Sequence, residues 1–357
     1  MCGAALRRAS HGYGICGVRG VMKAQCRTLL RSLLRETVST RAGFRVTNLV
    51  HGCLPRSVRR RLFYLCADER WPVEGHWTVH FAGRRVVLPL SRDFPLAWPA
   101  ALGFDGYDPE MHDLYAALVR GERPPRVFFD VGASYGLHSL RLLAHGIRVV
   151  SFEPNPRCHA FFTECCRANG LTPCIEPLAV GEFCGSVNFA APVDSTWLGS
   201  TLPEVWESWR GGAIDRWSVP QVSLDTYVAE QGPVPDLIKI DVEGSEDAVL
   251  RGAIGLLTAI RPTVLFESWP APAKRAELYA LLEGLDYDIA PVAMGTQGAA
   301  LTEHDFSMSV ATNFLARPRE APRAERRRFP LRRAISYPVT VDVLQEVAEL
   351  VELLVAR

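Results

Sequence analysis

One stretch of this chain, residues 126–155, restricts the possible folds more than any other. It reads RVFFDVGASYGLHSLRLLAHGIRVVSFEPN. A short apolar run ends at Asp130 and a glycine-containing turn, a helical pattern follows, and a second apolar run ends at Glu153. Short apolar runs on either side of a crossover helix predict two parallel strands. Because ligands of parallel sheets bind beyond the carboxyl ends of the strands, we expect both carboxylates at a ligand site.

The same arrangement recurs twice further along the chain. Residues 237–240 form an apolar run that ends at Asp241, followed by Glu243 and a helical pattern that begins with acidic residues. Acidic side chains suit the positive end of a helix dipole. The next apolar run ends at Glu267. The sequence therefore predicts four strands of one sheet, each with a carboxylate at its tip.

The glycine turn after the first strand argues against a dinucleotide. A dinucleotide site needs GxGxxG, whereas Ser134 stands where the second glycine belongs. An adenosine that carries a small zwitterion, S-adenosylmethionine, suits DxGxxxG better. Its amino-acid part needs backbone groups and a carboxylate, and its ribose needs an acceptor for two hydroxyl groups. We assign the first role to Asp130 with Gly132 to Gly136, and the second to Glu153.

Several segments together make the interpretation more specific. DVGASYG, SFEPNP, PLAVGEFCGSVNF, VSLDTYV, DLIKIDVEGSE, VLRGA and RPTVLFE follow one another along the chain. In this order the chain resembles the FkbM family of S-adenosylmethionine-dependent methyltransferases, from about Gly106 to Pro318. The resemblance implies an α/β fold of the Rossmann-like class I methyltransferase type. Such a fold has a seven-stranded, mostly parallel sheet with one antiparallel strand and helices on both faces.

The resemblance also implies a function, an S-adenosylmethionine-dependent O-methyltransferase that methylates a hydroxyl group on a sugar or secondary metabolite. The cofactor-binding residues carried over are Asp130, Gly132, Ala133, Ser134, Gly136, Glu153, Pro154, Ala179 and Asp241. Ser134 replaces the asparagine of the frequent DVGANxG pattern. Ser200–Thr201 resembles a serine-rich segment that the family has near its cofactor pocket.

The predicted chemistry depends on Asp241. In-line methyl transfer requires the acceptor oxygen to be aligned with the methyl carbon, and we expect Asp241 to orient the acceptor and take its proton. Alternatively, a divalent cation held by Asp241 with Glu243 or Glu267 would lower the pKa of the acceptor. His304 is a second candidate that could face the substrate. His138, after the glycine turn, is expected to pack or to contact cofactor.

Two other functions remain open at this stage. A protein that kept the fold and lost the chemistry would bind a ligand or partner only, and a nicotinamide-dependent dehydrogenase is less favoured. The expected acceptor is a small molecule or a glycan, and no nucleic-acid partner is expected. Trp197, Trp206, Trp209 and Trp217 lie in an irregular segment, residues 191–219, which either forms a substrate wall or packs an insertion.

The remaining elements are predicted from local patterns. Residues 22–66 show helical patterns, and residues 77–90 predict a hairpin around Ala82–Gly83. Asp108 is expected to cap a helix that begins at Pro109. Two strands are predicted over 175–180 and 185–192, the second antiparallel, and YDIAPV and SVATNFLARP read as late strands of the main sheet.

The balance of basic and acidic residues changes along the chain, and we use this change to predict the domains. Up to Arg61 there are 13 Lys and Arg residues against one acid, Glu36, whereas the whole chain has 40 against 39. We divide the chain into a basic extension with helices and a hairpin (1–105), a methyltransferase domain (106–318), and a basic linker with an amphipathic helix (319–357). Two copies of the chain could pair through that final helix to form a homodimer. No apolar segment is long enough to span a membrane, so we expect a cytoplasmic protein.

The ten cysteines contain no CxxC pair, and we expect reduced, mostly packed thiols. A zinc site built from Cys158, Cys165, Cys174 and Cys184 is a weak alternative, because adjacent Cys165 and Cys166 fit poorly around one tetrahedral metal.

Overall fold

The computed structural model describes residues 17–319, except 68–69, 72, 95, 196, 210–211, 294–295 and 298. The predicted C-terminal helix and most of the basic linker therefore lie outside the described residues. In the described part, no helix combines the length and the apolar character needed to cross a bilayer.

The main sheet has eight strands in the order β12-β11-β13-β10-β9-β3-β4-β5. In that order, they are Thr296–Gln297, Tyr287–Ala293, Asn313–Pro318, Thr263–Glu267, Leu237–Ile240, Val127–Val131, Arg148–Phe152 and Ile175–Glu176. Strands β5, β4, β3, β9 and β10 are parallel, and β13 is antiparallel to both β10 and β11. The predicted seven-stranded, mostly parallel sheet with one antiparallel strand is confirmed, and the two-residue β12 extends its edge.

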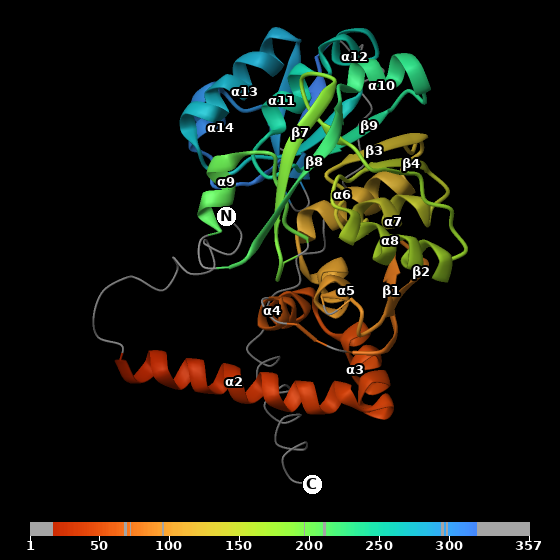
Figure 1. Ribbon diagram of the computed structural model, residues 1–357, viewed down its shortest axis with the longest axis vertical. Coiled ribbons are helices and arrows are strands. Elements are labelled where there is room, and N and C mark those ends of the chain that lie inside the picture. The colour runs from red at the N-terminus through yellow and green to blue at the C-terminus, as the bar shows by residue number, and fades with distance from the viewer. Residues whose placement is uncertain are drawn as a thin grey trace.

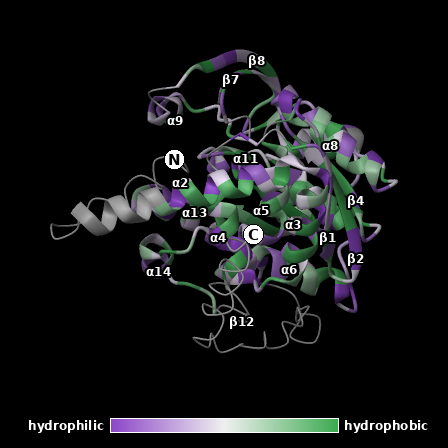
Figure 2. Ribbon diagram, turned by 90° about the horizontal axis from the view of Figure 1, so that it is seen from below, coloured by the Kyte–Doolittle hydropathy of each residue, from purple (hydrophilic) through white to green (hydrophobic). Residues whose placement is uncertain are grey.

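Side chains alternate between two cores, one on each face of the sheet. Phe128 and Val149 belong to one core, whereas their neighbours Phe129 and Val150 belong to the other. The first core includes α6 (Pro109–Arg120), α7 (Leu137–Leu143) and α8 (Pro156–Ala168). The second includes α10 (Leu224–Gln231), α11 (Glu246–Arg251), α12 (Ile254–Ala259), α13 (Pro272–Gly284) and α14 (Glu303–Met308). Helices thus cover both faces of the sheet. In Figure 2 the green, hydrophobic residues gather toward the middle of the molecule.

The basic N-terminal part packs into the first core. It consists of α2 (Gly17–Ser39), α3 (Arg41–Cys53), α4 (Arg56–Cys66), the hairpin β1 (Gly75–Phe81) and β2 (Arg84–Leu90), and α5 (Ala97–Gly106), drawn in red and orange in Figure 1. Trp77 of the hairpin and Trp98 of α5 are fully buried in the same core as Leu140 of α7. The helices over residues 22–66 and the hairpin match the predicted patterns, whereas α5 was not predicted, and the domain boundary near residue 105 stays a prediction.

Two local predictions were wrong, those for residues 175–180 and 191–219. The expected strand over 175–180 is split, because Pro177 has no backbone N–H group and the chain turns there; Ala179–Val180 is β6 of a separate sheet. That sheet also contains β7 (Gly185–Pro192), so the antiparallel strand predicted over 185–192 is confirmed and lies in this smaller sheet. The segment 191–219 is not wholly irregular, since β8 (Ile214–Val222) begins within it.

The helix predicted from Pro109 is present, but Asp108 does not cap it as expected. Its backbone is left-handed, with φ 43°, and its side chain makes no capping hydrogen bond. Instead, Asp108 Oδ2 accepts a hydrogen bond from Asn313 Nδ2 at 3.1 Å. A contact with a distant strand therefore replaces the local cap.

Candidate active site

A cavity of about 320 Å³ lies at the carboxyl ends of the central strands. Strands β3 and β9 are neighbours there, and the chain order runs outward from them in opposite directions. Ligands of open α/β sheets bind at such a reversal of strand order. The predicted cofactor residues that line the cavity are Gly132, Ala133, Ser134, Glu153, Pro154, Ala179 and Asp241.

The glycine turn after β3 is shaped by close contact with the loop after β9. Gly132 has φ 78°, and a Cβ atom there would lie 1.8 Å from the carbonyl oxygen of Asp241. The Asp241 backbone N–H donates to the carbonyl of Val131 at 3.0 Å. Only glycine permits both the left-handed backbone and this approach. Gly132 therefore holds the two strand ends, and Asp241 with them, in contact.

Ser134 occupies another left-handed position, with φ 50°. Asparagine tolerates this conformation better than most residues with a side chain. The left-handed backbone at this position therefore explains why the frequent family pattern, DVGANxG, has asparagine there.

Glu153, at the end of β4, reaches across to the glycine turn. Its Oε2 accepts a hydrogen bond from the backbone N–H of Ser134 at 2.6 Å, and its Oε1 accepts one from Asn155 at 2.7 Å. Burial raises its pKa to about 7, although these two hydrogen bonds favour the ionised form. A carboxylate has about four lone-pair sites, so both oxygens retain capacity for further donors.

Asp130 and Gly136 support the turn without lining the cavity. Asp130 is fully buried, and its Oδ2 accepts hydrogen bonds from the backbone N–H and the hydroxyl of Ser139, at 3.0 and 2.6 Å. Gly136 has φ 70°, and a Cβ atom there would lie 2.2 Å from the ring of Phe162. Among the residues the structure describes, these two predicted positions thus contact protein instead of the open cavity.

Carboxylates gather around Asp241 on the other side of the cavity. Asp241 Oδ2 accepts a hydrogen bond from Lys239 Nζ at 3.0 Å. Burial would lower the pKa of Lys239, but Asp241 and Asp130 raise it. Burial and the nearby Asp241 raise the pKa of both Glu243 and Glu267. Since these groups repel one another when ionised, the cavity favours positive charge.

A second carboxylate orders the loop that carries Asp241. Oε1 of Glu246 accepts hydrogen bonds from the backbone N–H groups of Val242 and Gly244, at 3.2 and 3.1 Å. Burial raises the pKa of Glu246 to about 7. Glu246 is one of the acidic residues at the start of this helix, which the sequence analysis related to the helix dipole. It also fixes the loop by direct hydrogen bonds.

The segment after β7 closes the cavity from outside. Trp197 and Thr201 line it, and the Thr201 hydroxyl lies 2.9 Å from the Ser245 hydroxyl. Ser200 is buried and donates to the carbonyl of Glu243 at 3.0 Å. The other three tryptophans of this segment do not line the cavity; Trp217, for example, packs against Phe189. The predicted wall is therefore reduced to Trp197, with Trp269 from beyond β10.

The N-terminal part supplies a wall that the sequence did not predict. Residues of α4, α5 and α6 with the turn before it line the cavity: Phe63, Tyr64, Ala67, Ala100, Gly103, Tyr107, Asp108 and Met111. Their helical patterns indicated packing faces only, and no local signal connected them with the strand ends. His138 also lines the cavity, whereas His304 is exposed on α14 and does not.

Neither of the two metal sites considered from the sequence has a ready set of ligand side chains in the described residues. Within the described ranges, no three His, Cys, Asp or Glu side chains lie close enough together to hold a metal ion. This covers Asp241, Glu243 and Glu267 as well as the four cysteines of the zinc alternative. Cys158 and Cys165 are buried free thiols, whereas Cys174 and Cys184 are exposed.

Comparison with protein families gives one match, which covers the part of the chain that contains most of this site. Residues 130–289 match the model of the methyltransferase FkbM domain. This part of the chain is an FkbM methyltransferase domain. The match lies within the region of predicted resemblance and contains the glycine turn, Glu153, Asp241 and Glu267. FkbM methyltransferases use S-adenosylmethionine as cofactor, and the cavity has backbone groups, carboxylates and apolar walls that suit its parts.

Solved structures with a related fold are distant in sequence. Methyltransferase FkbM from Methylobacillus flagellatus KT is 18% identical, with a TM-score of 0.34; the match covers 54% of this chain and 43% of that one. The 16S rRNA N2 G1207 methyltransferase of T. thermophilus, solved with AdoMet and guanosine, is 14% identical with a TM-score of 0.36, covering 69% and 50%. An Agrobacterium tumefaciens SAM-dependent methyltransferase is 12% identical with a TM-score of 0.36, covering 70% and 72%. Comparison with curated proteins gives no significant match.

Proposed function

We propose that this chain is an S-adenosylmethionine-dependent O-methyltransferase that acts on a hydroxyl group of a sugar or secondary metabolite. The main support is that one cavity contains the glycine turn, Glu153 and Asp241, and continues to the wall formed by α4 and α5. The first three suit the donor, and the remaining wall leaves a place for the acceptor beside Asp241. The domain match supports the same reaction class.

The ribose and the positively charged groups of the donor have suitable groups in the cavity. The oxygens of Glu153 that already accept from Ser134 and Asn155 have spare lone pairs for the two ribose hydroxyl groups. The carboxylates around Asp241 suit the positive sulfonium and ammonium groups. When bound, the donor supplies an electrophilic methyl group, and the chain's own contribution is to align an acceptor oxygen with it.

Asp241 is the proposed base. The side chain of Asp241 lies at the strand tip, about one-third exposed, and its Oδ2 lies 3.0 Å from the ammonium group of Lys239. A carboxylate at this position can accept the hydrogen bond of an acceptor hydroxyl and take its proton as the methyl group is transferred. General-base catalysis of this kind contributes roughly 10² to 10⁴ in rate. His304, which is exposed on α14, has no part in this proposal.

The test uses labelled donor and metabolite extracts to find an acceptor, followed by kinetics of Asp241→Asn. We expect turnover to fall by about 10²-fold or more while affinity for S-adenosylhomocysteine stays within a few-fold. Asp247→Asn is a matched control, since Asp247 pairs with Arg251 at 3.2 Å and does not line the cavity. Unchanged turnover of Asp241→Asn would remove it from the mechanism. Binding of the donor with no transfer to any acceptor would favour a protein that kept only the fold.

A further inference from the structure

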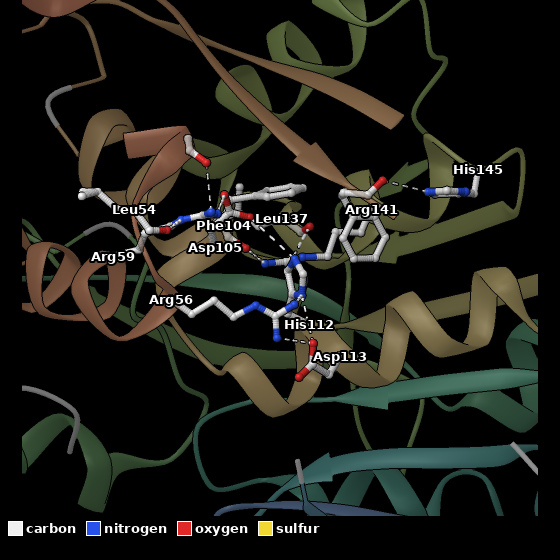
Figure 3. Close-up of polar contacts among 12 residues, drawn as sticks. Leu54, Arg56, Arg59, Phe104, Asp105, His112, Asp113, Leu137, Arg141 and His145 are labelled. Carbon is white, nitrogen blue, oxygen red and sulfur yellow. Dashed lines mark hydrogen bonds and ion pairs between the residues drawn. The ribbon is translucent and has the colours of Figure 1, made fainter. Parts of the chain in front are cut away.

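A buried arginine lines the cavity beside the glycine turn. Arg141 lies on α7, which follows that turn, and is 4% exposed. Its Nη1 donates to the carbonyl of Leu137 at 2.9 Å, its Nη2 donates to that of Phe104, and its guanidinium lies 4.2 Å from the centre of the Phe104 ring (Figure 3). The head group is therefore held against α5 and the start of α7, and Arg141 is one of the residues that line the cavity.

The positive charge of Arg141 has no direct ion-pair partner among the described residues, although Asp105, Asp108 and Asp130 lie near enough to favour its charged form. Its Nε is buried and has no hydrogen-bond partner, and it forms no ion pair with the residues that the structure describes. The nearby Asp105 instead pairs with Arg59 at 3.0 Å, as Figure 3 shows. A buried charge without a partner is costly, so the arrangement favours an anionic ligand.

Arg275 is a buried arginine away from the cavity, and protein groups accept hydrogen bonds from all of its guanidinium nitrogens. Arg275 is fully buried and lies away from the cavity. Its three guanidinium nitrogens all have partners, which are the carbonyls of Ser268, Phe306, Ser309 and Ala311 and the hydroxyl of Ser268. Arg141 differs in two respects, because one nitrogen is left without a partner and the side chain borders open space.

The other cation of the cavity is already engaged. Among the described lining residues, Lys239 and Arg141 are the two with a permanent positive charge. Lys239 Nζ lies 3.0 Å from Asp241 and 3.9 Å from Asp130. His138 also lines the cavity, three residues before Arg141 on α7, and its buried Nδ1 has no partner. Burial and then the charge of Lys239 lower its pKa well below 6.5, so it remains neutral.

We propose that Arg141 binds the carboxylate of the methyl donor's amino-acid part, with His138 Nδ1 available as a second contact. This inference rests on the proposed function, which requires S-adenosylmethionine in the cavity. The donor carries two positive groups and one negative group. The carboxylates around Asp241 suit the positive groups, and Arg141 is the cation left for the negative one.

The experiment compares two ligands that differ in the amino-acid part. S-adenosylhomocysteine carries the carboxylate, whereas 5′-methylthioadenosine lacks the whole amino-acid part and keeps the adenosine. Their dissociation constants are measured by calorimetry on the full chain, for the unchanged protein, Arg141→Gln, Arg141→Lys and Arg275→Gln. Arg275→Gln is the matched control, because it also removes a buried guanidinium that donates to carbonyl groups.

We expect Arg141→Gln to weaken S-adenosylhomocysteine binding about tenfold or more and to change 5′-methylthioadenosine binding by less than about threefold. Arg141→Lys should recover part of the loss, and Arg275→Gln should leave the ratio of the two affinities unchanged. Retained binding of 5′-methylthioadenosine shows that the variant is folded.

Two results would overturn the assignment of Arg141. They are an equal loss of affinity for both ligands and no loss for either ligand. If the unchanged protein binds neither adenosyl ligand, the proposed function fails together with this inference. If it binds both but the ratio does not respond to Arg141→Gln, only the role of Arg141 fails.

Discussion

Replacing Gly132 by alanine tests how the two central strand ends are held together. The backbone of Gly132 is left-handed, with φ 78°, and this conformation costs an alanine about 1–2 kcal/mol. The new Cβ would also meet the Asp241 carbonyl oxygen at 1.8 Å and its carbon at 2.8 Å. The strand ends would have to separate by roughly 1.5 Å to restore a normal contact. That movement would weaken the 3.0 Å hydrogen bond from Asp241 N–H to Val131.

A matched control separates the two costs. Gly146 has nearly the same backbone, with φ 76°, but a Cβ there would meet nothing within 4 Å. Gly146→Ala should therefore cost only the conformational part. The clash and weakened hydrogen bond should destabilise Gly132→Ala by about 1–3 kcal/mol beyond Gly146→Ala.

Thermal unfolding of the two variants gives the answer. Each kcal/mol corresponds to roughly 2–4 °C in a domain of this size. We expect a lower Tm for Gly132→Ala than for Gly146→Ala, together with weaker binding of S-adenosylhomocysteine. Equal Tm values would show that the close approach of β3 and β9 is not a constraint, and the reasoning about Asp241 placement would be wrong.

Three further predictions concern the same region. Since folding raises the pKa of Glu153 from 4.5 to about 7, the folded state holds its proton more tightly than the unfolded state, and this contribution to stability is lost as pH rises from about 4.5 to 7. Urea unfolding between pH 5 and 8 should show a smaller fall for Glu153→Gln than for the unchanged protein; equal falls would contradict the burial of an ionisable Glu153. Ser134→Asn should raise the free energy of unfolding by up to about 1 kcal/mol, because asparagine tolerates φ 50° better, and a decrease would point to a specific role of the serine hydroxyl. The metal-assisted alternative predicts that exhaustive chelation stops turnover and that added Mg²⁺ restores it, so turnover that survives chelation would eliminate it.

The sheet could be predicted because each strand is recognisable from its own short stretch of sequence. Each central strand is a short apolar run that ends in a carboxylate, and parallel strands bring those ends to one edge. The glycine turn was also predictable as a ligand site, but the reasons for its glycines were not. Gly132 meets the loop after β9, and Gly136 meets the ring of Phe162, and both contacts join segments that are separate in the sequence.

The other side of the cavity could not be predicted for the same reason. Phe63 of α4 and Met111 of α6 come from helices whose patterns indicate only a buried face, and the sequence does not tell which element that face meets. Asp108 satisfied every local rule for a helix cap, yet Asn313 binds it instead. Arg141 looked like one more charged helix residue, and only its burial without a direct ion-pair partner among the described residues makes it distinctive.

The most direct test of the account is the melting temperature of the full chain with S-adenosylhomocysteine, S-adenosylmethionine or NADH. A ligand at 100 times its dissociation constant stabilises the folded state by about 2.7 kcal/mol, which should raise the Tm by several degrees. We expect that rise with both adenosyl ligands and none with NADH, because Ser134 takes the place of the glycine that a pyrophosphate would need. A rise with NADH and none with either adenosyl ligand would contradict the account.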